Sequence, residues 1–262
     1  MKKQIKAVDA RGRKLGGETP LLCTPLVSRT RERLLAEAAT VLRQKPDIIE
    51  WRVDFFDAIG NTNIVVETAR ALRAVIGKTP VIFTRRAQKE GGGPIAIGDA
   101  QVVELYAAVA ATQLVDFIDF EMDNDPEHLR RIREFTRRHE IRLILSYHNV
   151  GYTPGHAYLV DRFLEAERLG GDVAMVQVMP RDRGDVLRLL AATVEADDKA
   201  RIPLISIALG PLGSVTRMVG GLFGSWLSFA VGESASAPGQ IPIGDLVTIF
   251  DILRRARGGE ML

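Results

Sequence analysis

Short apolar segments alternate with longer amphipathic segments along almost the whole chain. The short segments are nearly continuous in apolar residues, which is typical of strands buried on both faces of a parallel sheet. They predict eight strands, at residues 21–24, 48–53, 81–84, 117–120, 143–146, 175–178, 204–208 and 225–229. Apolar residues at spacings of three and four predict helices between them, at 30–42, 63–76, 99–112, 125–139, 157–169, 183–195 and 243–256.

Eight strand–helix units are compatible with a closed barrel or with an open, doubly wound sheet. The count of eight favours a (β/α)₈ TIM barrel in the α/β class, and no G-x-G-x-x-G motif follows the first strand. Residues 1–20 carry turn signals at Gly12, Gly16 and Gly17 and are predicted to form a β-hairpin that closes the bottom of the barrel. No linker divides the chain, so we expect a single domain over residues 1–262, close to the usual length of such a barrel, about 250 residues.

Composition excludes several classes of protein. The 35 basic and 33 acidic residues give a net charge of +2, which provides no indication of a nucleic-acid partner. The single cysteine, Cys23, cannot form a disulfide within the chain and indicates a reducing compartment. The polar, basic N-terminus is unlike a secretion signal, and the apolar stretch at 218–232 is shorter than the roughly 20 residues that span a membrane. We therefore expect a cytoplasmic protein without membrane contact.

Polar residues gather at the ends of the predicted strands, where barrels of this kind place their active sites. Glu50 and Arg52 are two apart on one strand and therefore point the same way, into the barrel. Of the adjacent pair Arg85 and Arg86, alternation predicts that Arg86 faces the site and Arg85 faces solvent. No histidine pair has metal-ligand spacing on one face, so we expect no metal site. We also expect no cofactor. The other strand-end polar residues are Thr24, Glu90, Glu121, His148, Arg217, Ser236 and Gln240.

Four segments, taken in order, resemble type I 3-dehydroquinate dehydratases: IIEWRVD at 48–54, FTRRAQKEGG at 83–92, SYHN at 146–149 and SASAPGQI at 234–241. The resemblance covers essentially the whole chain and includes VMP at 178–180. It implies the third step of the shikimate pathway, the syn elimination of water from 3-dehydroquinate to give 3-dehydroshikimate. It also implies a lysine that forms an imine with the C3 ketone, a homodimer, and a small cyclic hydroxy acid as the ligand.

The resemblance assigns chemical roles to three residues. His148 matches the general acid and base, Glu90 matches its partner carboxylate, and Arg217 matches the arginine that binds the substrate carboxylate. A bidentate guanidinium suits that last role. The remaining predicted substrate-binding residues are Thr24, Glu50, Arg52, Arg86, Phe229, Ser236 and Gln240.

When VMP at 178–180 is aligned with the same motif of the family, Met175 takes the position of the imine lysine. The nearest downstream lysine, Lys199, falls in a predicted helical region. Methionine can neither form an imine nor donate a hydrogen bond, so we expect the pocket to survive and the activity to be very low or absent. Two origins of Met175 stay open, an engineered exchange that traps a ligand and a natural homologue that has lost the imine chemistry.

Two alternative functions are weighed against the dehydratase. A homologue that naturally lacks the lysine is expected to bind cyclic acids of the quinate or shikimate type as a non-catalytic or regulatory protein. Another lyase or aldolase-like barrel is disfavoured, because such enzymes also use a lysine on the sixth strand and the SAPGQI segment speaks against them.

Overall fold

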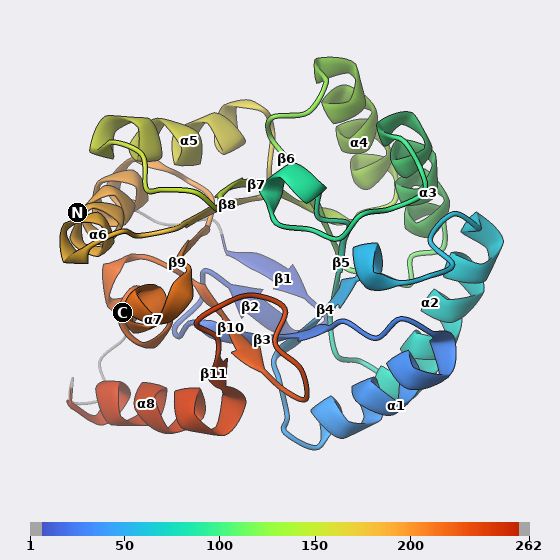
Figure 1. Cartoon of the computed structure of the whole chain (residues 1–262), viewed down its shortest axis with the longest axis horizontal. Coiled ribbons are helices and arrows are strands. Elements are labelled where there is room, and N and C mark those ends of the chain that lie inside the picture. The colour runs from blue at the N-terminus through green and yellow to red at the C-terminus, as the bar shows by residue number, and fades with distance from the viewer. Residues whose placement is uncertain (1–6, 257–262) are drawn as a thin grey trace.

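The computed structural model describes residues 7–256, and within them nine parallel strands form one curled sheet surrounded by helices (Figure 1). Strands β3 to β9 follow one another in chain order, and β10 lies beside β3. A single bridge between Leu204 and Ser225 joins β9 to the segment just before β10 and closes the ring. The strands are β3 (Leu21–Leu26), β4 (Ile48–Arg52), β5 (Val81–Thr84), β6 (Phe117–Glu121), β7 (Arg142–Asn149), β8 (Val173–Val178), β9 (Leu204–Ala208), β10 (Leu227–Val231) and β11 (Ile241–Pro242). The predicted (β/α)₈ barrel is confirmed.

The helices begin where the sequence supplies capping groups. The side chains of Asn61 and Asp182 each accept a hydrogen bond from the backbone N three residues on, and Pro126 follows the capping Asp125. None of the helices in residues 7–256 is long and apolar enough to cross a membrane. They are α1 (Arg31–Leu42), α2 (Thr62–Ile76), α3 (Asp99–Ala111), α4 (Pro126–Arg138), α5 (His156–Arg168), α6 (Arg183–Lys199), α7 (Gly210–Val219) and α8 (Ile243–Ala256), with short 3₁₀ turns η1 (Val53–Phe55), η2 (Gln88–Glu90) and η3 (Gly220–Phe223).

Helix α7 is absent from the predicted elements. It is short, and its sequence GPLGSVTRMV contains two glycines and a proline, which weaken the apolar periodicity that marks a helix. Proline at the first turn is compatible with a helix because the amide that it lacks would have no partner within the helix. The helix matters for function because it carries Arg217.

Side chains of each strand alternate between the inside of the barrel and the layer beneath the helices. On β4, Ile48 belongs to the apolar cluster inside the barrel, whereas Ile49 and Trp51 belong to the cluster between strands and helices. Glu50 and Arg52 share the inward parity of Ile48 and line the cavity described below. The expectation that both charges face into the barrel is therefore confirmed.

An antiparallel hairpin, β1 (Val8–Ala10) and β2 (Arg13–Leu15), closes the N-terminal end of the barrel. Its buried side chains, including Leu15, belong to the same apolar cluster as the barrel interior. Arg11 Nε donates to Asp116 Oδ1 at 2.6 Å, immediately before β6. In Figure 1 the hairpin crosses the middle of the ring of strands. This agrees with the predicted hairpin, although residues 1–6 lie outside the described residues.

Candidate active site

A cavity of about 260 Å³ lies at the C-terminal end of the barrel, where barrels of this class place their active sites. Its walls come from the strands β4, β7, β8 and β10, from the segments after β5 and β9, and from the loop between β10 and β11. All predicted site residues except Thr24 and Met175 are brought together here. The lining residues are Glu50, Arg52, Arg86, Glu90, Gly91, His148, Val150, Gln177, Met179, Leu209, Arg217, Phe229, Ser236, Ala237, Pro238 and Gln240.

His148 and Glu90 form a hydrogen-bonded pair in the wall of this cavity. Glu90 Oε2 lies 2.9 Å from His148 Nδ1 and accepts from the backbone N of the same residue at 3.0 Å. When Nδ1 donates its proton to the carboxylate, Nε2 keeps a lone pair that can accept a proton from a ligand. Burial, with a smaller contribution from Arg86, holds the pKa of His148 well below its ordinary value, so the ring is neutral near pH 7.

Glu90 is positioned by the short turn that follows β5. Its backbone N donates to Ala87 O at 2.9 Å, and the chain then turns back on itself at Gly92. A Cβ at Gly92 would lie only 1.9 Å from Arg86 O, so no other residue fits there without moving the turn. Burial raises the pKa of Glu90 to about 7, against the opposing charge of Arg86. The carboxyl group therefore titrates near neutral pH.

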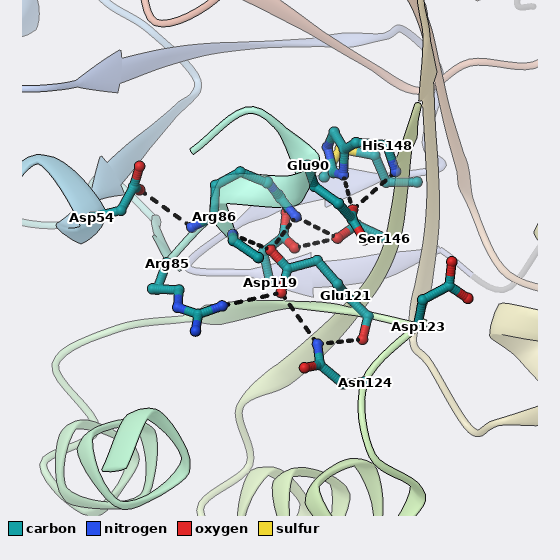
Figure 2. A network of polar contacts seen from close by, with 12 residues as sticks. Asp54, Arg85, Arg86, Glu90, Asp119, Glu121, Asp123, Asn124, Ser146 and His148 are labelled. Atoms are coloured by element: carbon teal, nitrogen blue, oxygen red, sulfur yellow. Dashed lines mark hydrogen bonds and ion pairs between the residues drawn. The ribbon is translucent and has the colours of Figure 1, made fainter. Parts of the chain in front are cut away.

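Arg86 is held in a fixed orientation by a buried network (Figure 2). Its NH2 donates to Asp119 Oδ2 at 2.6 Å, and its NH1 donates to Glu121 Oε1 at 3.1 Å and to Ser146 Oγ at 2.8 Å. Ser146 Oγ in turn donates to Asp119 Oδ1 at 2.6 Å. Burial alone would lower the pKa of Arg86, but Asp119 and Glu121 outweigh it and raise the pKa. The guanidinium is thus a permanent, rigid charge at the pocket.

Arg85 is also buried, which makes the expectation of a solvent-facing side chain wrong. Its NH2 donates to Asp99 at 2.6 Å, and its NH1 lies 3.9 Å from Glu121 Oε2. Strand alternation does not apply to this pair because β5 ends at Thr84, before both arginines. Only Arg86 lines the cavity, as predicted.

Arg52 and Asp54 form a second buried ion pair, which faces the cavity from the end of β4. The Arg52 atoms Nε and NH2 each donate to one carboxylate oxygen of Asp54 at 2.8 Å. Asp54 also accepts from the backbone amides of Arg86 and Gly93, and this links β4 to the segment after β5. Burial raises the pKa of the neighbouring Glu50, against the opposing charge of Arg52. Polar groups that can both accept and donate therefore converge on this side of the cavity.

Arg217 presents a buried positive charge without an ion pair among residues 7–256. The residue is 2% exposed; its NH1 donates to Phe229 O at 3.3 Å, its NH2 donates to Pro238 O at 3.5 Å, and its Nε has no partner. Burial lowers the pKa of Arg217 to about 10. An uncompensated buried charge is costly, so this guanidinium is suited to an anionic ligand.

The loop between β10 and β11 covers this part of the cavity and is fastened to α7. Gly210 N donates to Pro238 O at 3.1 Å, and Gln240 holds the loop from inside. Its Oε1 accepts from Ser236 N at 2.8 Å, and its Nε2 donates to Ser236 Oγ at 3.1 Å. Figure 1 shows the loop in front of β10 and β3. Ser236 and Gln240 therefore contribute to a shaped cover over the cavity.

A comparison with known protein families finds one that accounts for this arrangement. The family model described as Type I 3-dehydroquinase matches residues 22–257. The chain belongs to the type I 3-dehydroquinase family. The family is that of 3-dehydroquinate dehydratases, which are carbon–oxygen lyases.

Curated members of the family match this chain over almost its entire length. The 3-dehydroquinate dehydratase of Albidiferax ferrireducens is 49% identical over 97% of this chain and 96% of its own length. That of Aromatoleum aromaticum is 44% identical over 94% of both chains. The solved 3-dehydroquinate dehydratase of Geobacillus kaustophilus is 42% identical, with a TM-score of 0.94 over 95% of this chain and 97% of its own. The type I enzyme of Clostridium difficile, solved with covalently modified comenic acid, is 33% identical, with a TM-score of 0.93 over 97% of this chain and 100% of its own.

In this member of the type I 3-dehydroquinase family, Met175 lies inside the barrel, just below the cavity. It is 1% exposed, belongs to the inner apolar cluster, and is two residues before the lining residue Gln177 on β8. The amide Nε2 of Gln177 lies 3.4 Å from Met175 Sδ. Within the described part of the chain, no lysine lines the cavity. Position 175 thus lies beneath the lining residue Gln177, within an apolar environment.

Thr24 lies away from the cavity, contrary to its predicted role in substrate binding. It pairs in register with the outward-facing Ile49, and its methyl group lies beside Val41 of α1, close to Gly232. Its Oγ1 is buried without a partner. Thr24 does lie on the predicted strand. Because side chains alternate along β3, however, Cys23 points into the barrel and Thr24 points towards the helices.

Several residues of the site were not singled out from the sequence. Asp119 and Ser146 fix Arg86, and Gln177 lines the cavity beside His148. A signal existed for two of them, since Asp119 and Gln177 are polar residues inside buried strands and each lies two residues from an inward-facing apolar position.

Proposed function

We propose that this chain binds 3-dehydroquinate, or a closely related cyclic hydroxy acid, in the cavity at the top of the barrel. We further propose that it cannot dehydrate 3-dehydroquinate through an imine. The observation that carries the proposal is the unpaired, buried guanidinium of Arg217, which lines the same cavity as the His148–Glu90 pair, while no lysine of residues 7–256 lines that cavity.

The carboxylate of the ligand is expected to bind Arg217. The guanidinium is buried, and its only acceptors among the described residues are two backbone carbonyl groups. A carboxylate would supply the missing negative charge and form charge-assisted hydrogen bonds, which are about twice as strong as neutral ones. Glu50 and Arg52 are available for the hydroxyl groups of the ring, because both face the same cavity.

The reaction requires the movement of one proton and one electron pair. His148 Nε2 removes the C2 proton, the pair from that C–H bond forms the C1–C2 double bond, and the C1 hydroxyl leaves as water with the proton from His148. Between these events the pair must be held by the group at C3. An imine, formed from a lysine amine and the ketone with loss of water, holds it well because its nitrogen is cationic.

Met175 cannot provide that electron sink. Its thioether has no proton to donate and no amine to condense with the ketone. The pair would have to reside on the ketone oxygen, stabilised only by hydrogen bonds. Loss of a covalent nucleophile commonly costs several orders of magnitude in rate, so dehydration by this chain is expected to be very slow.

Replacement of Met175 by lysine tests this proposal. We expect Met175→Lys to raise the rate of 3-dehydroshikimate formation by at least about 100-fold, because the amine restores the imine. The rate is measured by ultraviolet absorbance of the conjugated product, and borohydride trapping with mass spectrometry identifies the adduct. Met122→Lys, at another buried methionine outside the cavity lining, is the matched control and should gain nothing. A Met175→Lys variant that folds yet stays inert would contradict the assignment of the reaction.

A second candidate function is favoured by Met175 itself. The groups that would bind the ligand are retained while the position proposed for the nucleophile is apolar, which suits a non-catalytic or regulatory protein that binds quinate or shikimate. Calorimetry with quinate, shikimate and 3-dehydroquinate tests it. Heat of binding without turnover supports this function, and the absence of heat with all three would exclude it.

A homodimer and a cytoplasmic location also belong to the proposal, by likeness to the family. Light scattering coupled to size-exclusion chromatography should then give twice the chain mass of 28.8 kDa. A mass equal to one chain at micromolar concentration would contradict the dimer.

A further inference from the structure

Gln177 is the only polar residue of the buried strand β8, and it faces the cavity. It lies in register with His148 on the neighbouring strand β7. Below it, on the same face of β8, is Met175. Gln177 therefore occupies the wall between the proton-accepting histidine and the position proposed for the missing nucleophile, yet the mechanism above leaves it without a role.

The amide of Gln177 has most of its hydrogen-bonding capacity unused. Its Nε2 contacts only Met175 Sδ, at 3.4 Å, and its Oε1 has no hydrogen bond among the described residues. A thioether is a weak acceptor, so a ligand oxygen can replace this contact at little cost. The neighbouring lining residues Met179 and Leu209 would pack equally well against an apolar side chain. Packing alone therefore does not account for an amide here.

We propose that Gln177 binds the ligand oxygen that faces β8 and makes the cavity favour a ring alcohol over a ring ketone at that position. The proposal rests on the proposed function, which places the C3 oxygen of the ligand above Met175. A hydroxyl group can accept from Nε2 and donate to Oε1 of one amide in a cyclic arrangement. A ketone oxygen has no proton, so it can use only Nε2.

This arrangement changes the ligand for which the cavity is best suited. A lysine at position 175 requires a ketone, because only a carbonyl group forms an imine. With Met175 and Gln177 together, the covalent bond is replaced by neutral hydrogen bonds that suit quinate better than 3-dehydroquinate. Gln177 thus determines specificity and has no part in breaking bonds.

The test is calorimetric titration of the full chain and of Gln177→Met with three ligands. Methionine keeps the length of glutamine and removes the amide. The ligands are quinate, with an alcohol at C3, 3-dehydroquinate, with a ketone, and 3-deoxyquinate, without oxygen at C3. A neutral hydrogen bond changes affinity by a factor of about five. We therefore expect Gln177→Met to lower the affinity for quinate by about tenfold or more and the affinity for 3-dehydroquinate by about fivefold or less. The affinity for 3-deoxyquinate should not change.

Two further variants keep the test decisive. Gln177→Ala replaces Gln177→Met should the latter not fold, and Gln101→Met makes the same exchange on the exposed first turn of α3, where no ligand affinity should change. An equal loss of affinity for all three ligands, or no loss of affinity for quinate, would overturn the role of Gln177 without contradicting ligand binding in the cavity. No heat with any ligand, even for the unmodified chain, would overturn the proposed function and this assignment with it.

Discussion

Arg217 and Arg86 are both buried at the cavity, but their charges are balanced in different ways. Arg86 lies between Asp119 and Glu121, which raise its pKa. Arg217 has only carbonyl acceptors among the described residues, and burial lowers its pKa. At the scale of single residues, the first is a fixed part of the wall and the second is a charge that needs a ligand.

Removal of Arg217 should separate stability from binding. Arg217→Leu eliminates an unpaired buried charge, so we expect the free protein to lose little stability or to gain some. Affinity for quinate or 3-dehydroquinate should fall by at least about 30-fold, because a buried carboxylate loses its partner. Thermal unfolding and calorimetry measure the two effects. Arg254→Leu, on the exposed last turn of α8, is the control for both, and a ligand affinity that survives Arg217→Leu would contradict the anionic contact.

Glu90 and His148 should make stability depend on pH in opposite directions. Burial raises the pKa of Glu90 to about 7 from 4.5, so between these values the folded protein binds more protons there than the unfolded chain. The contribution of Glu90 to the free energy of unfolding is therefore fully present below pH 4.5 and is lost as the pH rises towards 7. Burial lowers the pKa of His148 well below 6.5, so its contribution to stability instead rises with pH up to about 6.5.

Urea unfolding over a pH series isolates the Glu90 contribution. The free energy of unfolding of the unmodified chain, relative to Glu90→Gln, should fall by about 1–3 kcal/mol between pH 4.5 and 7.5. The same comparison with His148→Gln should have the opposite slope below pH 6.5. A difference for Glu90→Gln that does not change with pH would show that this carboxyl titrates at its ordinary value in the fold.

At the scale of elements, the backbone of the loop between β10 and β11 packs closely against the backbone at the start of α7. Gly239 has a φ of +77°, and a Cβ there would lie 2.1 Å from Gly210 O. Both the backbone conformation and the lack of space therefore require glycine. The loop carries Ser236 and Gln240, so its position determines how the cavity is covered.

Gly239→Ala should consequently weaken binding without unfolding the barrel. We expect an affinity loss of about tenfold, because the strained loop cannot stay docked at a cost of roughly 1–2 kcal/mol, and only a small change in melting temperature. Gly98→Ala is the control, since a Cβ at that position meets nothing within 4 Å. Unchanged affinity in Gly239→Ala would mean that the loop does not contribute to the closed site.

At the scale of the whole molecule, the hairpin that closes the barrel and the polar cavity that is the candidate active site lie at opposite ends of the barrel. The hairpin β1–β2 covers the N-terminal end and joins the inner apolar cluster, whereas the polar cavity opens at the other end. Met175 lies between them, with its side chain in that cluster. The inner cluster therefore supports the floor of the site.

Leu15→Ala tests how independent the two ends are. Leu15 is buried in the hairpin, so its truncation should cost about 2–4 kcal/mol of unfolding free energy while ligand affinity stays unchanged. Chemical denaturation and calorimetry give the two values. Leu187→Ala, where the side chain is 67% exposed, should change stability by less than about 0.5 kcal/mol. A parallel loss of affinity in Leu15→Ala would show that the two ends are coupled.

Much of the fold could be predicted from local patterns. Strand β5 and strand β9 have the predicted bounds, because a buried parallel strand is marked by a continuous apolar run. The inward direction of Glu50 and Arg52 follows from the same alternation. Helix α7 was missed because its glycines and proline dilute the periodicity, and Arg85 was misplaced because strand alternation does not extend into a loop.

By itself, the sequence determined the eight-unit barrel, the family and most of the residues that meet at the cavity, because these depend on periodicity and on motifs local to the chain. Only the tertiary structure decided that Arg217 lacks an ionic partner among the described residues, that Asp119 and Ser146 hold Arg86, and that Thr24 faces the helices. These properties depend on distances between segments far apart in sequence and on burial. Burial changes the cost of a charge, and no local pattern encodes it.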